Sequence, residues 1–264
     1  MAMMGSIAAA CANACEEALE RRNVPLDRGQ LSFVLRPGPG PRLVLIPGSF
    51  NDSRQWNEVT SGLGCDLELV LVELRGHGQS WPPPMDGSIE QFAEDVLRVT
   101  ESLGYRGFYI GGHSIGGMVA IEVGHQRPES VQGIISLEGW THHEVVQEAF
   151  AGRNYDTLTP ELNSRRLAAR EQATGHWKKA QRVEFARIWR RWDGEAFLRR
   201  TDIPILEVYG DRGREKAPRE KLRLPRRNNI TLRWIENASH SLPLEQPSKV
   251  AGLIMEFIQA NGPK

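Results

Sequence analysis

The sequence predicts an α/β fold with a mostly parallel, doubly wound sheet. Three observations support this prediction. Short, continuous apolar runs such as 43–46 are typical of strands buried on both faces. Amphipathic segments such as 88–103 alternate with these runs along the chain, which is the order found in parallel sheets. The 264 residues are 40% hydrophobic and 25% charged, which is enough apolar material for a sizeable core.

The N-terminal segment 1–24 is predicted to be a helical extension. It is rich in Ala, and no Lys or Arg precedes the sequence Ala12-Asn13-Ala14, so a signal peptide is disfavoured. Residues 16–22 begin with acidic and end with basic side chains, which complements a helix dipole.

The remaining elements follow in order along the chain. Ser88 and Gln91 form a capping box at the start of one helix, and Gly104 ends it. The apolar patterns predict strands at 31–35, 43–46, 67–74, 108–110, 131–137, 203–209 and 230–235, and helices at 88–103, 115–126 and 250–259.

Residues 139–200 contain no strand pattern and are predicted to be helical. They lie between two predicted strands, so they form an insertion into a core made of residues 25–138 and 201–264. Ligands bind at the carboxyl ends of parallel strands. A helical cap at that edge would enclose such a ligand.

The sequence Gly112-His113-Ser114-Ile115-Gly116 matches the pattern G-x-S-x-G. An apolar strand leads into it and a helix leads out of it. In this context the pattern is typical of a sharp turn that presents the Ser114 hydroxyl as a nucleophile. A phosphate-binding loop is disfavoured because the Lys-Ser/Thr of a P-loop is missing.

At these residues the chain resembles the α/β-hydrolase fold family, of the serine esterase type, over residues 31–258. Three further stretches carry the resemblance. Residues 46–50 stand where the family has His-Gly-x, although Pro47 replaces the His. Residues 73–80 are similar to the family's acidic-x-Arg-Gly-His-Gly-x-Ser loop, in which we expect His77 to tether the loop. Residues 239–247 resemble the stretch that bears the catalytic His.

The resemblance implies a helical cap after the sixth strand and assigns roles to particular residues. His240 would be the base, and the amides of Ser49 and Ile115 would form the oxyanion hole. Because His113 adjoins the nucleophile, its side chain is expected to point away and pack beneath the turn. Phe50 and Trp140 neighbour these positions and are predicted to bind substrate.

The acid of the triad has two candidates. The commonest family position falls on Gly213, which carries no carboxylate, and Asp211 lies two residues before it. The second position follows strand 131–137 and holds Glu138, as it does in haloalkane dehalogenases and coelenterazine luciferases. A carboxylate that closes an apolar strand is costly unless it is paired. This favours Glu138 over Asp211.

The expected function is that of a carboxylesterase-like serine hydrolase. Ser114 would attack the carbonyl of a small to medium organic ester, His240 would relay the proton, and Glu138 would orient His240. No metal or cofactor is implied. A dehalogenase is disfavoured because its chemistry needs a carboxylate at position 114. The alternatives are a cofactor-free dioxygenase or carbon–carbon-bond hydrolase that uses His240 as base, and a receptor that binds without turnover.

The composition limits the classes of binding partner and the cellular compartment. Lys and Arg number 33, as do Asp and Glu, so no net charge indicates nucleic acid or a membrane surface. Residues 151–200 carry 12 basic against 6 acidic side chains, a surplus that would attract an anionic substrate, although solvated helix faces explain it more simply. No apolar run approaches the ~18 residues of a membrane span. Three cysteines fit a reducing compartment, which predicts a cytoplasmic protein. The sequence does not fix the oligomeric state.

Overall fold

The computed structural model describes residues 19–82, 87–150, 157–213 and 215–262. An eight-stranded sheet with the order β1-β2-β4-β3-β5-β6-β7-β8 runs through it. The strand β2 is antiparallel to both of its neighbours, and the strands from β4 to β8 are parallel. The mostly parallel sheet is therefore confirmed. Its strands are β1 (Glu20–Pro25), β2 (Gln30–Arg36), β3 (Arg42–Ile46), β4 (Glu68–Val72), β5 (Phe108–His113), β6 (Val131–Leu137), β7 (Ile205–Gly210) and β8 (Ile230–Ile235).

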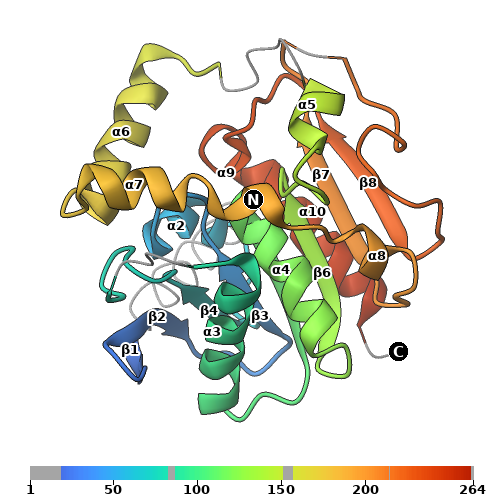
Figure 1. Ribbon diagram of the computed structural model, residues 1–264. Coiled ribbons are helices and arrows are strands. Elements are labelled where there is room, and N and C mark those ends of the chain that lie inside the picture. Colours follow the sequence, from blue (N-terminus) through green and yellow to red (C-terminus); the bar gives the residue numbers. More distant parts are fainter. Residues whose placement is uncertain (1–18, 83–86, 151–156, 214, 263–264) are drawn as a thin grey trace, which may run out of the picture.

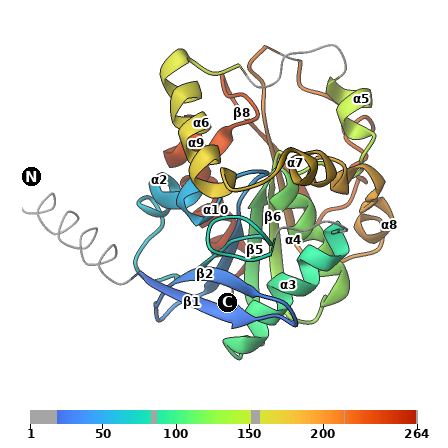
Figure 2. The same ribbon diagram turned by 60° about the vertical axis from the view of Figure 1, so that its left-hand side comes forward.

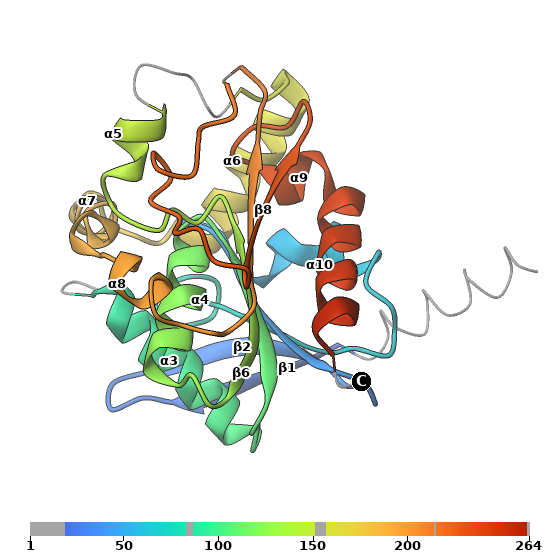
Figure 3. The ribbon, with the colours of Figure 1, turned by 90° about the vertical axis from the view of Figure 1, so that its right-hand side faces the viewer.

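Helices cover both faces of the sheet (Figure 3). The helices α3 (Ile89–Ser102) and α4 (Ile115–Gln126) lie on one face, and α10 (Pro247–Asn261) lies on the other with the short helix α2 (Asn57–Thr60). Val44 and Leu45 of β3 belong to different apolar cores, because successive side chains of a strand point to opposite faces. This explains why the central strands are continuous apolar runs. The one-turn elements η1 (Ser53–Trp56) and α9 (Leu242–Glu245) flank the site described below.

The N-terminal prediction is wrong where the structure describes it. Residues 20–25 form the strand β1, which pairs antiparallel with β2 from Glu20 opposite Leu35 to Pro25 opposite Gln30. The charged side chains of Glu20, Arg21 and Arg22, which belonged to the predicted helix, instead lie on an exposed edge strand, where charged side chains are common. Pairing with β2 satisfies the backbone and outweighs local helix preference. Residues 1–18 lie outside the described residues.

The segment between β6 and β7 contributes helices beyond the carboxyl ends of the parallel strands (Figure 1, Figure 2). Thr159 caps the N-terminus of the helix α6 (Pro160–Thr174), because its side chain accepts a hydrogen bond from the Leu162 amide. Pro160 suits the first turn of this helix. The elements are α5 (Val145–Phe150), α6 (Pro160–Thr174), α7 (Lys179–Phe185), η2 (Ile188–Arg191) and α8 (Glu195–Leu198).

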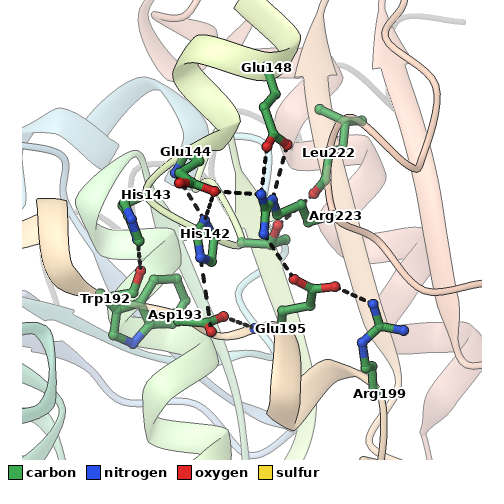
Figure 4. Close-up of polar contacts among 11 residues, drawn as sticks. His142, His143, Glu144, Glu148, Trp192, Asp193, Glu195, Arg199, Leu222 and Arg223 are labelled. Atoms are coloured by element: carbon green, nitrogen blue, oxygen red, sulfur yellow. Dashed lines mark hydrogen bonds and ion pairs between the residues drawn. The ribbon is translucent and has the colours of Figure 1, made fainter.

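A charged network connects this helical segment to the loop between β7 and β8 (Figure 4). The Arg223 guanidinium lies 2.5 Å from a carboxylate oxygen of Glu144, 2.5 Å from Glu148 and 3.4 Å from Glu195. Beside it the rings of His142 and His143 stack with centroids 4.0 Å apart. The network therefore joins α5 and α8 to a loop that belongs to the core of the fold.

None of the helices within the described ranges has the length and the apolar character needed to cross a bilayer. The cytoplasmic location stays a prediction.

Candidate active site

Ser114 lies on a sharp turn between β5 and α4. Its φ of 55° and ψ of −121° are unusual for a residue with a side chain, and its amide donates a hydrogen bond to the Leu137 carbonyl at 2.9 Å. A Cβ on Gly112 would lie 2.1 Å from the Gly116 carbonyl carbon, and a Cβ on Gly116 would lie 2.3 Å from the Ile46 oxygen. Only glycine therefore fits on either side, which explains the G-x-S-x-G spacing.

Three residues that are distant in sequence meet at this turn. The His240 Nε2 atom lies 3.1 Å from the Ser114 hydroxyl oxygen. Its other ring nitrogen, Nδ1, lies 3.2 Å from a carboxylate oxygen of Glu138. Ser114 and His240 are half-buried, whereas Glu138 is fully buried. The structure thus brings Ser114, His240 and Glu138 into one hydrogen-bonded line.

The backbone holds Glu138 in place at the end of β6. Its φ is 56°, and its amide donates to the Val208 carbonyl at 2.8 Å. One carboxylate oxygen accepts from the Gly210 amide at 2.7 Å, which leaves the other oxygen directed at His240. A carboxylate that accepts a backbone hydrogen bond and faces an imidazole suits the role of orienting that ring.

The alternative acid, Asp211, contacts other groups. One of its carboxylate oxygens accepts from the Asn237 amide at 2.7 Å, and the other lies 3.5 Å from the Lys216 ammonium. These contacts stabilise the turns after β7 and β8. The geometry therefore favours Glu138 as the partner of His240.

His113 holds the base from below, a role that the sequence pattern does not indicate. Its Nε2 donates to the His240 carbonyl at 2.7 Å, and its Nδ1 accepts from the Gln55 side chain at 2.9 Å. The Gln55 carbonyl oxygen in turn accepts from the Gly48 amide at 2.8 Å. Burial lowers the pKa of His113 to about 3, so its ring is neutral and carries a single N–H. His113 is also a lining residue of the cavity described below.

The loop after β3 lies opposite this turn and contains Ser49. The next residue, Phe50, has a φ of 62°, and its amide donates to the Nε2 atom of His77 at 3.2 Å. The His77 Nδ1 donates to the Arg75 carbonyl at 3.1 Å, and burial lowers the pKa of His77 to about 4. The prediction that His77 tethers its loop is confirmed, and the contact fixes the backbone beside Ser49.

The amides of Ser49 and Ile115 flank Ser114 from two elements. Ser49 lines the cavity beside Ser114, and Ile115 is the first residue of α4. The first-turn amides of a helix have no partner within that helix. Both positions are compatible with donation to an oxygen bound in front of Ser114, as the sequence predicts.

A cavity of about 400 Å³ opens beside Ser114 and His240. One wall comes from α6, and the others come from the η1–α2 region and the α9 turn. Its lining residues are Ser49, Asn51, Arg54, Gln55, Asn57, Glu58, His113, Ser114, Arg165, Arg166, Ala168, Ala169, Arg170, Gln172, His240, Ser241, Pro243 and Leu244. Among the described residues, no cluster of three His, Cys, Asp or Glu side chains suits a metal ion.

Phe50 and Trp140, the predicted substrate-binding residues, are not among the lining residues of this cavity. The Trp140 ring stacks on the His240 imidazole, with centroids 5.6 Å apart. The Phe50 ring lies edge-on to Phe185, at 5.2 Å between centroids. The structure therefore places both side chains against the walls of the site, and their contact with substrate stays a prediction.

Comparison with known proteins agrees with this fold. A family model described as the alpha/beta hydrolase fold matches residues 41–176. A putative carbamate hydrolase, RutD, from Pseudomonas savastanoi pv. phaseolicola is 32% identical over 102 residues, which are 38% of this chain and 39% of that protein. The matched regions cover between 29% and 43% of the length of such curated relatives.

Solved structures show the same fold over almost the whole chain. The N-acyl homoserine lactonase AidH, bound to N-hexanoyl homoserine, aligns with a TM-score of 0.74 at 18% identity, over 93% of this chain and 98% of that one. A haloalkane dehalogenase variant from Bradyrhizobium elkanii aligns with a TM-score of 0.70 at 14% identity, over 93% and 100% of the two chains. Together with the family model, these similarities show that the chain belongs to the α/β-hydrolase fold family.

Proposed function

We propose that the protein is a serine hydrolase that cleaves carboxylic esters of small to medium size through an acyl-enzyme on Ser114. The observation that carries this proposal is the hydrogen-bonded line from Ser114 through His240 to the buried Glu138, with distances of 3.1 and 3.2 Å. A serine hydroxyl is a weak nucleophile until an adjacent base removes its proton. In this site His240 is within reach of that proton.

The first half-reaction forms the acyl-enzyme. The Ser114 hydroxyl oxygen attacks the ester carbonyl while His240 Nε2 takes its proton. Glu138 stabilises the imidazolium that results and holds its Nδ1–H in the correct orientation. The amides of Ser49 and Ile115 stabilise the negatively charged oxygen of the tetrahedral intermediate. Loss of one such donor typically costs about 3 kcal/mol of transition-state stabilisation. The protonated His240 then gives its proton to the alcohol oxygen, and departure of the alcohol completes the acyl-enzyme.

The second half-reaction regenerates the enzyme. A water molecule then gives a proton to His240 and attacks the acyl carbon, and Ser114 is released with its proton restored. The sum is one ester plus one water to one acid plus one alcohol. We propose that residues 139–200 act as the cap that shields this acyl-enzyme, since α6 forms one wall of the cavity.

The test is turnover of p-nitrophenyl acyl esters of increasing chain length by the wild type and by Ser114→Ala. We expect an early burst of p-nitrophenol from the wild type and none from the variant. A Ser114→Ala variant that keeps the wild-type rate would refute the mechanism and assign the chemistry to His240 alone. A wild-type protein that binds such esters without cleaving any of them would instead be a receptor.

A further inference from the structure

The cavity beside Ser114 has an unusual charge distribution. Four arginine side chains line it, together with the carboxylate of Glu58. Arg54 is ion-paired with Asp52, and Arg165 is ion-paired with Glu58. A wall with this much positive charge beside a nucleophile is an attractive site for an anionic group.

Arg170 differs from the ion-paired arginines. Its Nε atom is buried, and among the described residues it has no hydrogen-bond partner. No carboxylate of the described chain forms an ion pair with its guanidinium, and the charged side chain that acts on it most is Arg166, a like charge. Burial and Arg166 together lower the pKa of Arg170. Burying a cation without a counterion is costly.

An aromatic ring lies near the Arg170 charge. Among the described residues, the Arg170 guanidinium carbon lies 5.9 Å from the centroid of the Phe50 ring. A cation over an aromatic face gains only a weak electrostatic attraction, whereas a bidentate carboxylate gives two charge-assisted hydrogen bonds. The Phe50 ring therefore stabilises the Arg170 charge less than a bound carboxylate would.

We propose that Arg170 binds a carboxylate of the substrate, so that the ester cleaved at Ser114 is itself anionic. This inference rests on the proposed function. The cavity that contains Arg170 also contains Ser114 and His240, and its volume of about 400 Å³ suits a compact molecule with both groups. A planar guanidinium matches the two oxygens of a carboxylate.

Arg182 provides a matched control for Arg170. Its guanidinium carbon lies 6.0 Å from the centroid of the same Phe50 ring. Unlike Arg170 it is not a lining residue of the cavity, and its guanidinium donates to the Thr174 carbonyl at 2.7 Å. If a substitution acts only through packing on Phe50, Arg170→Gln and Arg182→Gln should therefore have the same effect.

The experiment compares monomethyl adipate with methyl hexanoate, two methyl esters of the same chain length that end in a carboxylate and in a methyl group, respectively. We expect the wild type to favour the adipate ester in kcat/KM. Arg170→Gln should lose about 10- to 100-fold in kcat/KM for the adipate ester, the range expected for a lost charge-assisted hydrogen bond. The loss that this variant shows on methyl hexanoate, which has no carboxylate for Arg170 to bind, should be at least tenfold smaller than its loss on the adipate ester. Arg170→Lys should retain part of the selectivity, and Arg182→Gln should retain all of it.

A binding measurement separates this inference from the proposed function. Calorimetry with free adipate should show binding to the wild type and at least tenfold weaker binding to Arg170→Gln. If adipate binds in this way but neither ester is cleaved, the esterase proposal fails and the anion site stands. If the wild type cleaves methyl hexanoate with the same kcat/KM as the adipate ester, the inference is overturned and the esterase proposal stands. The same conclusion follows if Arg170→Gln slows both esters equally.

Discussion

Replacement of Glu138 by Gln should disable the enzyme without unfolding it. The amide oxygen of the new side chain can keep the 2.7 Å bond from the Gly210 amide, which turns its NH₂ toward His240 Nδ1, 3.2 Å away in the wild type. A donor there forces Nδ1 to accept, so the proton moves to Nε2 and points at Ser114. His240 is then unable to take the serine proton, and the charge that stabilised the imidazolium is lost. The corresponding amide change in another triad lowers kcat about 10⁴-fold, or roughly 5.5 kcal/mol.

The matched control is Asp211→Asn. Asn can keep the hydrogen bond from the Asn237 amide and loses only a partly exposed ion pair with Lys216. Such pairs contribute about 0–1 kcal/mol, so kcat should change by less than about fivefold. The assay is steady-state turnover of a p-nitrophenyl ester, with circular dichroism to confirm folding. A crippled Asp211→Asn beside a nearly normal Glu138→Gln would refute the reasoning and move the acid to the end of β7.

Three further predictions test the surroundings of the site. His113→Phe should lower kcat/KM by roughly 10- to 100-fold, because the His240 carbonyl loses its hydrogen-bond donor and the His240 ring moves. Ester kinetics equal to those of the wild type would argue against a positioning role for His113. Burial raises the pKa of Glu207 from its ordinary value of 4.5 to about 8. Between these two pH values the Glu207 carboxyl keeps its proton in the folded state and loses it in the unfolded state. The unfolding free energy should therefore fall by about 1.4 kcal/mol per unit as the pH rises from 5 to 8, and urea titrations should find this slope absent in Glu207→Gln. Arg223→Ala removes exposed ion pairs and should lower the melting temperature by only about 2–4 °C with turnover unchanged; a large loss of turnover would show that the network of Figure 4 positions the site.

The sheet could be predicted from the sequence because its central strands are buried on both faces. The apolar runs at 43–46 and 131–137 are too short for buried helices, so they indicate strands. The edge strand β1 could not be predicted in this way. Its burial pattern is almost entirely exposed, and its pairing with β2 from Glu20 to Pro25 depends on a neighbour that the local pattern does not reveal.

The site was predictable where a residue type is imposed by the backbone. A Cβ atom on Gly112 or Gly116 would lie 2.1 or 2.3 Å from a backbone atom, so both positions require glycine. The two glycines therefore mark Ser114 in the sequence. Glu138 was detectable because a carboxylate that closes an apolar strand needs a partner.

Other residues of the site carry no such local signal. Gln55 and His113 are 58 residues apart and meet only in the folded chain. Arg170 is one of three arginines of α6, with Arg165 and Arg166. Its distinction is a missing counterion within the described residues, and that property exists only in three dimensions.

The central claim is that Ser114 is the nucleophile, and covalent labelling tests it most directly. The wild-type protein would be incubated with a fluorophosphonate, digested and mapped by mass spectrometry, while residual ester hydrolysis is measured in parallel. We predict a single adduct on Ser114 whose growth matches the loss of activity, and neither labelling nor turnover in Ser114→Ala. Full ester turnover by wild-type protein whose Ser114 stays unlabelled would contradict the account.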